Sequence, residues 1–300
     1  MFKQFILGGI TAVTLAILAG CGSNPVYQPS AVQPQAIDTS AYAPKVDSFV
    51  VILDVSSSMA EDYQDRPKVH TAQDLVASFN STVPPGKYEA GLVTFGRRSG
   101  RCIGGGTANA AYGLAPYVAG DFASALGSLE CAGGTTPMSD GVDAAAQMLS
   151  SQTGPVAVIL VSDFQWVDGG AVESAVSQLR AQHGENLCLH TVKVGDNVTG
   201  DALITNLTPS AGCDSAVQAG DIASAGAMAT YVTDVLLAPL QYEKHTVAAT
   251  ALFDFDKAVL KQQGKAELHN LDEYIKSQGI RVADIDVVGH TDSVGSAEYN

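Results

Sequence analysis

Basic side chains are scarce in this sequence of 300 residues, where 16 lysines and arginines face 31 aspartates and glutamates. The formal net charge of −15 repels polyanions, so nucleic acid and an anionic membrane surface are excluded as main partners. The middle region holds one basic cluster, formed by Arg97, Arg98 and Arg101. It is interpreted as a solvated loop, with a contact for an acidic partner as the alternative.

The residue patterns of common catalytic and zinc sites are also missing. No two of the five cysteines are separated by only two residues, and the six histidines are scattered, so zinc is not expected. Neither a Gly-x-Ser-x-Gly motif nor a His-Glu-x-x-His motif occurs, and no general base is evident. We therefore expect a binding protein rather than an enzyme.

Strand-like and helix-like segments alternate through the middle of the chain. This order predicts an α/β fold with a doubly wound, mainly parallel sheet covered on both faces. Strands are expected at 48–54, 88–95, 156–162, 187–194 and 214–219, and helices at 68–82, 138–150, 171–182, 201–207 and 223–237. Ligands of such sheets bind at the carboxyl ends of the strands, so the residues that follow the strands are the candidates for function.

Oxygen-bearing side chains follow two of these strands. Asp54, Ser56 and Ser58 come directly after the apolar run 48–53, and Asp163 ends the apolar run 156–162. A glycine loop before the helix expected at 138–150 adds Thr136. Hard oxygen ligands of this kind suit Mg²⁺ or a similar cation.

The ordered trio of segments resembles the metal-ion-dependent adhesion site of von Willebrand factor type A domains, whose sheet is Rossmann-like. Position by position, the resemblance gives five metal ligands: Asp54, Ser56, Ser58, Thr136 and Asp163. Thr136 is preferred over Thr135 because it directly precedes Pro137 and Met138. The resemblance implies bound Mg²⁺, or Mn²⁺ or Ca²⁺, and a partner protein that offers a carboxylate to the metal. A cation that only knits the loops together is the alternative.

Apolar residues after Asp163 are expected to add contact area around the metal. We expect Phe164, Trp166 and Val167 to be exposed there, although Trp166 packing against the domain is an alternative.

The amino terminus resembles a bacterial lipoprotein signal. A short basic start, an apolar run over 4–18 and the sequence Leu18-Ala19-Gly20-Cys21 predict a signal peptide at 1–20 and lipidation of Cys21. An ordinary secretory signal and an uncleaved anchor are the alternatives. Residues 21–45 are rich in proline, glutamine, alanine and serine, which predicts a flexible tether.

The four other cysteines are consistent with an oxidising compartment. Cys188 and Cys213 lie at the starts of two successive strands, while Cys102 and Cys131 flank a glycine-rich insertion. We predict the disulfides Cys188–Cys213 and Cys102–Cys131, although four cysteines allow three pairings.

The character of the chain changes after residue 240. An amphipathic stretch runs to about Gln278, a strand is expected at 282–288, and Gly289-His290-Thr291-Asp292 follows. These features resemble the opening of an OmpA C-terminal-type module, a partial α+β unit that binds the diaminopimelate of the peptidoglycan stem peptide. The resemblance assigns Asp292 and Asn300 to binding. The family's arginine would fall after Asn300, so we expect a fragment of a longer protein, with an incomplete module as the alternative.

The combined expectation divides the chain into a signal at 1–20, a tether at 21–45, a metal-binding domain at 46–240 and an OmpA-like part at 246–300. It describes a periplasm-facing lipoprotein of the outer membrane that joins the membrane, the peptidoglycan and an unidentified protein. A surface-exposed adhesin, or a secretion or assembly factor, is the alternative.

Overall fold

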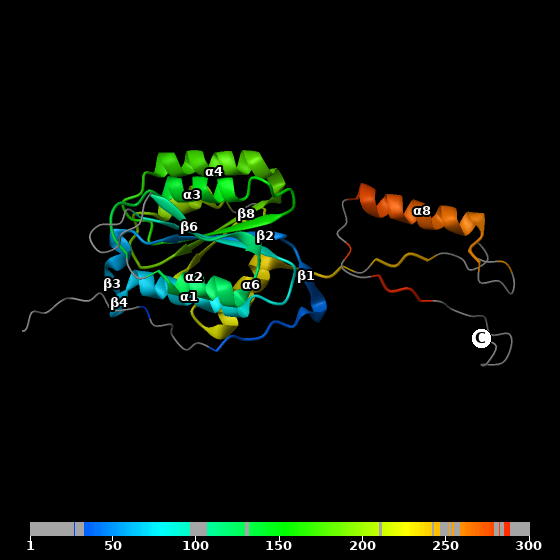
Figure 1. Cartoon of the computed structure of the whole chain (residues 1–300), viewed down its shortest axis with the longest axis horizontal. Helices are drawn as coiled ribbons and strands as arrows, with labels where there is room; N and C mark the ends of the chain where they lie inside the picture. Colours follow the sequence, from blue (N-terminus) through cyan, green and yellow to red (C-terminus); the bar gives the residue numbers. More distant parts are fainter. Residues whose placement is uncertain are drawn as a thin grey trace, which may run out of the picture.

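A mixed sheet of six strands forms the centre of the computed structural model (Figure 1), which describes residues 27, 33–96, 107–129, 132–209, 212–241, 243–246, 252, 254, 259–278, 282 and 285–288. The strand order is β6-β5-β2-β7-β8-β9. All neighbours are parallel except β5 and β6. The strands are β2 (Ser48–Asp54), β5 (Glu89–Phe95), β6 (Ala108–Pro116), β7 (Val156–Ser162), β8 (Leu187–Lys193) and β9 (Ser215–Gln218). The predicted α/β fold is confirmed.

Helices cover both faces of the sheet, which explains why β2 and β7 consist of apolar runs that are buried along their whole length. On one face lie α1 (Lys68–Thr82), α2 (Ala119–Gly127) and α6 (Ala225–Leu236). On the other lie α3 (Met138–Met148), α4 (Gly169–His183) and α5 (Asp201–Leu207). Each layer encloses its own apolar core.

Smaller elements close the two ends of the sheet. The pair β3 (Asp62–Tyr63) and β4 (Arg66–Pro67) lies at one end, and β1 (Tyr42–Pro44) pairs with β10 (Leu237–Pro239) at the other (Figure 1). The 3₁₀ helices are η1 (Thr39–Ala41), η2 (Ser57–Ala60), η3 (Gly184–Asn186) and η4 (Ala219–Ile222).

The sequence predicted the long elements to within two residues, but β6 and α2 were missed. Both belong to the segment that was interpreted as an insertion. Strand β6 is rich in alanine and includes Gly113, so it lacks the branched side chains that favour strands. It forms because it pairs with the edge of β5.

The tether prediction is wrong for part of residues 21–45. Tyr27 is buried and its ring lies 5.8 Å from that of His70. Ile37 packs against the core of the α1 face, and Tyr42 opens β1. Burying these apolar side chains on the domain is favourable in free energy. The proline-rich composition around them did not indicate this burial.

The prediction of a strand at 282–288 is also wrong for the residues described there. Helix α8 (Gln262–Ser277) matches the amphipathic stretch, but residues 282 and 285–288 do not adopt a strand, and Val287 is exposed. Apolar residues in a row favour a strand only where a sheet buries them, and Val287 is not buried. Within the described part of the chain, no helix is both long and apolar enough to span a membrane.

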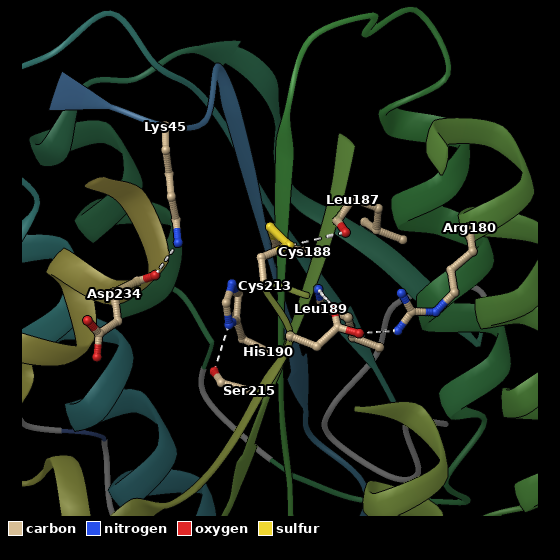
Figure 2. The surroundings of a disulfide bond; sticks show 10 residues. Lys45, Arg180, Leu187, Cys188, Leu189, His190, Cys213, Ser215 and Asp234 are labelled. Carbon is tan, nitrogen blue, oxygen red and sulfur yellow. Dashed lines mark hydrogen bonds and ion pairs between the residues drawn. A yellow bond between two sulfur atoms is a disulfide. The ribbon is translucent and has the colours of Figure 1, made fainter. Parts of the chain in front are cut away.

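A disulfide joins Cys188 in β8 to Cys213 before β9, as predicted for this pair of cysteines. Figure 2 shows its surroundings, in which His190 faces Ser215 and the amino group of Lys45 donates to the backbone carbonyl of Asp234. The disulfide therefore fixes the edge strand β9 to the sheet. Residues 102 and 131 lie outside the described residues.

Candidate metal centre

Asp54 ends β2 at the centre of the sheet and is fully buried. Its Oδ1 accepts a hydrogen bond from the backbone N–H of Ser56 at 2.8 Å, and its Oδ2 accepts one from Ser162 Oγ at 2.5 Å. Because β2 and β7 are parallel neighbours, their carboxyl ends meet at one edge. The strand order reverses its winding between β2 and β7, which is where ligands of such sheets bind.

Asp163 follows β7 and is also fully buried. Its Oδ1 accepts hydrogen bonds from Ser58 Oγ at 3.1 Å and from the backbone N–H of Gln165 at 3.0 Å. The hydroxyl oxygens of Ser56 and Ser58 lie 3.2 Å apart. Four of the five predicted ligands, Asp54, Ser56, Ser58 and Asp163, are thus connected in a chain of direct hydrogen bonds.

The loop that carries Thr136 is tied to the turn after β2. Gly133 donates its backbone N–H to the carbonyl of Val55 at 2.8 Å, and Ser57 donates to the carbonyl of Gly134 at 3.1 Å. Thr136 is half-buried, whereas Thr135 is exposed. The fold therefore brings the third predicted segment to the same edge as the two carboxylates.

A glycine lets the next strand approach this turn. Gly96 follows β5 with a φ of 143°, and a Cβ there would lie 2.7 Å from the carbonyl oxygen of Val55. Only glycine tolerates both this conformation and this contact.

The sequence analysis missed Lys68, which contributes a cation to the centre. It is the first residue of α1 and is buried. Its Nζ donates to Asp163 Oδ2 at 3.0 Å and to Glu61 Oε2 at 2.9 Å. The available signal was a lysine in the first turn of a helix, where the helix dipole disfavours a positive charge.

Electrostatics distinguish the two buried carboxylates. Burial raises the pKa of Asp54 to about 7, a rise that the charge of Asp163 reinforces and hydrogen bonds from Ser162 and Ser56 oppose. Among the residues that the structure describes, no lysine, arginine or histidine forms an ion pair with Asp54. A buried carboxylate without a counter-ion is costly, so Asp54 fits a site that a cation completes.

The donor set fits a hard divalent cation. Two carboxylates and two serine hydroxyls gather at one buried point, and all are oxygen ligands of the kind that Mg²⁺, Mn²⁺ and Ca²⁺ accept. The described residues of this centre include no thiolate or imidazole ligand that would favour zinc.

The loop after Asp163 differs from its prediction. Phe164 is buried in the core of the α4 face, Val167 is half-buried, and only Trp166 is strongly exposed, at 82%. The expected exposure of Phe164 is therefore wrong, because its ring fills the core between the sheet and the helices. Trp166 does not pack against the described part of the domain.

Comparison with known proteins agrees with this architecture. Residues 49–165 match the model of the von Willebrand factor type A domain. The α/β domain has the von Willebrand factor type A fold. This vWA domain includes the centre formed by Asp54 and Asp163, and the match extends from the start of β2 to just beyond Asp163.

Three solved structures illustrate what the chain is similar to. The SpRpn10 VWA domain is 17% identical with a TM-score of 0.44, over 58% of this chain and 87% of that one. The manganese-loaded TRAP protein of Plasmodium vivax is 11% identical with a TM-score of 0.44, over 66% and 78%. Proximal thread matrix protein 1 from the mussel byssus, with a zinc-occupied MIDAS motif, is 17% identical with a TM-score of 0.45, over 68% and 50%. Likeness at this level carries no information about function. No curated protein sequence matches the chain.

Several predicted sites lie outside the described residues. They are the lipidation site Cys21, the pair Cys102 and Cys131, and the peptidoglycan contacts Asp292 and Asn300. The basic cluster at 97–101 lies outside them as well.

Proposed function

We propose that the vWA domain binds a protein partner through a divalent cation held by Asp54, Ser56, Ser58, Thr136 and Asp163. The observation that carries this proposal is the fully buried carboxylate of Asp54, which has no cationic partner among the described residues. A bound cation would supply the missing charge. Its affinity for oxygen would also hold a carboxylate of the partner.

The partner surface includes the loop after Asp163. Trp166 stands exposed there, and a large exposed aromatic side chain beside a polar centre is typical of an interface anchor. The partner we infer therefore offers an acidic side chain to the cation and an apolar surface to Trp166.

We propose binding without catalysis. Among the described residues, Lys68 is the one basic side chain bonded to the centre, and both of its side-chain hydrogen bonds go to carboxylates. Burial lowers the pKa of Lys68, but the hydrogen bonds and charges of Glu61 and Asp163 outweigh this effect and leave the pKa raised. A lysine that stays protonated cannot act as a general base for Ser56 or Ser58.

For the setting of the domain, we propose a lipoprotein of the outer membrane that faces the periplasm. The support is the lipoprotein-like start up to Cys21, the OmpA-like motif that contains Asp292, and the disulfide Cys188–Cys213. Disulfides persist in oxidising compartments such as the periplasm. The OmpA-like part would then bind the diaminopimelate of the peptidoglycan stem peptide.

Titration calorimetry with MgCl₂ tests the metal centre. The wild type should release or absorb heat on binding, Asp54→Asn should not, and the exposed control Asp221→Asn should behave like the wild type. A wild type that binds neither Mg²⁺ nor Mn²⁺ would exclude the metal-dependent function. A second experiment distinguishes a partner-binding site from a cation that only stabilises the loops. In a binding site, the wild type captures a partner in Mg²⁺, and capture is lost with Asp54→Asn or with EDTA.

Sedimentation with purified peptidoglycan tests the second anchor. The full-length reading frame should co-sediment, and Asp292→Ala should reduce the bound fraction in both the presence and the absence of Mg²⁺. Failure of the wild type to sediment would remove peptidoglycan from the proposal and leave the metal centre unaffected.

A further inference from the structure

Lys68 lies at a position where the helix dipole disfavours its positive charge. It is the first residue of α1, and the amino end of a helix carries partial positive charge. The side chain is nevertheless buried, with 6% of the residue exposed. Two anions compensate its charge: the buried Asp163 at 3.0 Å and the more exposed Glu61 at 2.9 Å.

The backbone holds Lys68 and Glu61 together independently of their side chains. The N–H of Lys68 donates to the carbonyl of Glu61 at 3.0 Å, and the N–H of Glu61 donates to the carbonyl of Ser58 at 3.1 Å. Glu61 therefore follows directly on the turn of predicted metal ligands. The stem of Lys68 passes Gly195, where an added Cβ would be 3.5 Å from Cε.

The charges of the centre do not balance. Asp54 and Asp163 are both fully buried, and Lys68 is the one cation paired with either of them among the described residues. Lys68 contacts Asp163 Oδ2, whereas Asp54 receives only neutral donors. The ammonium of Lys68 thus pairs with Asp163, one of the two carboxylates that a divalent cation would bind.

We propose that Lys68 is the internal counter-ion of this centre and competes with the divalent cation for Asp163. Without the cation, its ammonium neutralises Asp163. When a cation binds, the ammonium is repelled from Asp163 and is held by Glu61, which lies within hydrogen-bond distance on the solvent side. This inference rests on the proposed metal-dependent function and adds that Lys68 and Glu61 set the affinity for the metal in opposite directions.

The two residues lead to opposite predictions. Lys68→Met removes the competing charge but keeps the length of the stem, so the affinity for Mg²⁺ should rise by about tenfold, the effect of one favourable charge interaction. Glu61→Gln removes the alternative partner of the ammonium, so the affinity should fall. If Lys68 were purely structural, its removal would instead weaken metal binding.

Lys193 provides a matched control. It is as buried as Lys68, lies at the end of the neighbouring strand β8, and forms its ion pair with Asp201 rather than with the centre. Lys193→Met and Lys68→Met should both lower the melting temperature of the metal-free protein, because each removes the ion pair of a buried lysine. It should leave the affinity for Mg²⁺ unchanged.

The experiment measures the Mg²⁺ dissociation constant by calorimetry, and the melting temperature in EDTA, for the whole chain and these three variants. Tighter binding by Lys68→Met together with weaker binding by Glu61→Gln supports the proposal. Unchanged or weaker binding by Lys68→Met overturns it while the metal centre stands. If Lys68→Met does not fold, unchanged or tighter binding by Glu61→Gln overturns it. Absence of binding in both the wild type and Lys68→Met removes the proposed metal function itself.

Discussion

Two buried titratable side chains make the stability of the vWA domain depend on pH in opposite directions. The pKa of Asp54 is raised from 3.8 to about 7 by burial, so the metal-free fold loses stability as pH rises through this range. The pKa of His190 is lowered from 6.5 to about 3 by burial and by the charge of Lys45. The folded state therefore resists protonation of His190. The stability that the neutral side chain contributes is lost progressively as pH falls from 6.5 towards 3.

His190 offers a clean test, because one ring nitrogen contacts Ser215 Oγ at 2.7 Å and the other is buried without a hydrogen-bond partner in the described part of the chain (Figure 2). His190→Asn keeps a group that can bond Ser215 but removes the titration. The advantage of the wild type in unfolding free energy should shrink by about 1.4 kcal/mol per pH unit below pH 6.5. Urea titrations at pH 5.5 and pH 7.5 measure the difference in unfolding free energy between the two proteins. All other titratable groups are the same in both proteins, so their contributions cancel. A difference that does not change with pH would contradict the prediction.

At the scale of an element, the loop at 164–167 is held in an unusual backbone conformation. Phe164 and Trp166 have φ values of 54° and 56°, which side chains other than glycine rarely adopt. Hydrogen bonds to Ser162 Oγ and Asp163 Oδ1 from the backbone of Phe164 and Gln165 hold this conformation. The loop buries Phe164 and turns Trp166 outward, and Asp163 is linked to Trp166 through the adjacent residue Gln165.

Trp166 is the one tryptophan of the sequence, which makes it a reporter of the metal centre. We expect Mg²⁺ to change its fluorescence, because Asp163 accepts hydrogen bonds from both the backbone and the side chain of Gln165, the residue next to Trp166. Asp163→Asn should abolish the response, and Asp221→Asn should retain it. A response that survives Asp163→Asn would place its origin elsewhere in the chain.

The edge strand β9 depends on a covalent link. It has four residues and pairs only with β8 among the described strands, and the disulfide Cys188–Cys213 closes a loop with a sequence separation of 25. Replacing both cysteines by alanine should lower the free energy of unfolding by about 3 kcal/mol. Chemical denaturation measures this loss. Hydrogen exchange should then be fastest in β9, and an unchanged exchange rate there would contradict the assigned role.

For the whole molecule, only the carboxyl-terminal connection lies at the end of the sheet away from the centre. The predicted ligands follow the carboxyl ends of β2 and β7, whereas β1 and β10 pair at the other end (Figure 1). On the amino-terminal side of β1, however, Tyr27 packs on His70, which lies in the first turn of α1 together with Lys68. The connection to the carboxyl-terminal part therefore leaves away from the centre, whereas the amino-terminal segment returns to the end of α1 that carries Lys68.

The vWA domain should also fold without the carboxyl-terminal part. Both core clusters are built from residues up to Leu237, and none of their members belongs to α8. Removing residues 247–300 should leave its melting temperature unchanged within about 1 °C, since none of the core contacts among the described residues is lost. Calorimetry of the whole chain and the shortened chain makes this comparison. A drop of several degrees would show that the module stabilises the domain.

The sequence alone determined the parallel strands and the order of the oxygen ligands, because both are local patterns. Apolar runs mark β2 and β7, and the residues directly after them mark Asp54 and Asp163. The tertiary structure decided the ion pair of Lys68 with Asp163, two residues 95 positions apart that carry no local signal of contact. It also decided the burial of Phe164 and the pairing of β6 with β5. These features depend on which surfaces meet when the sheet closes, and composition and periodicity describe only one segment at a time.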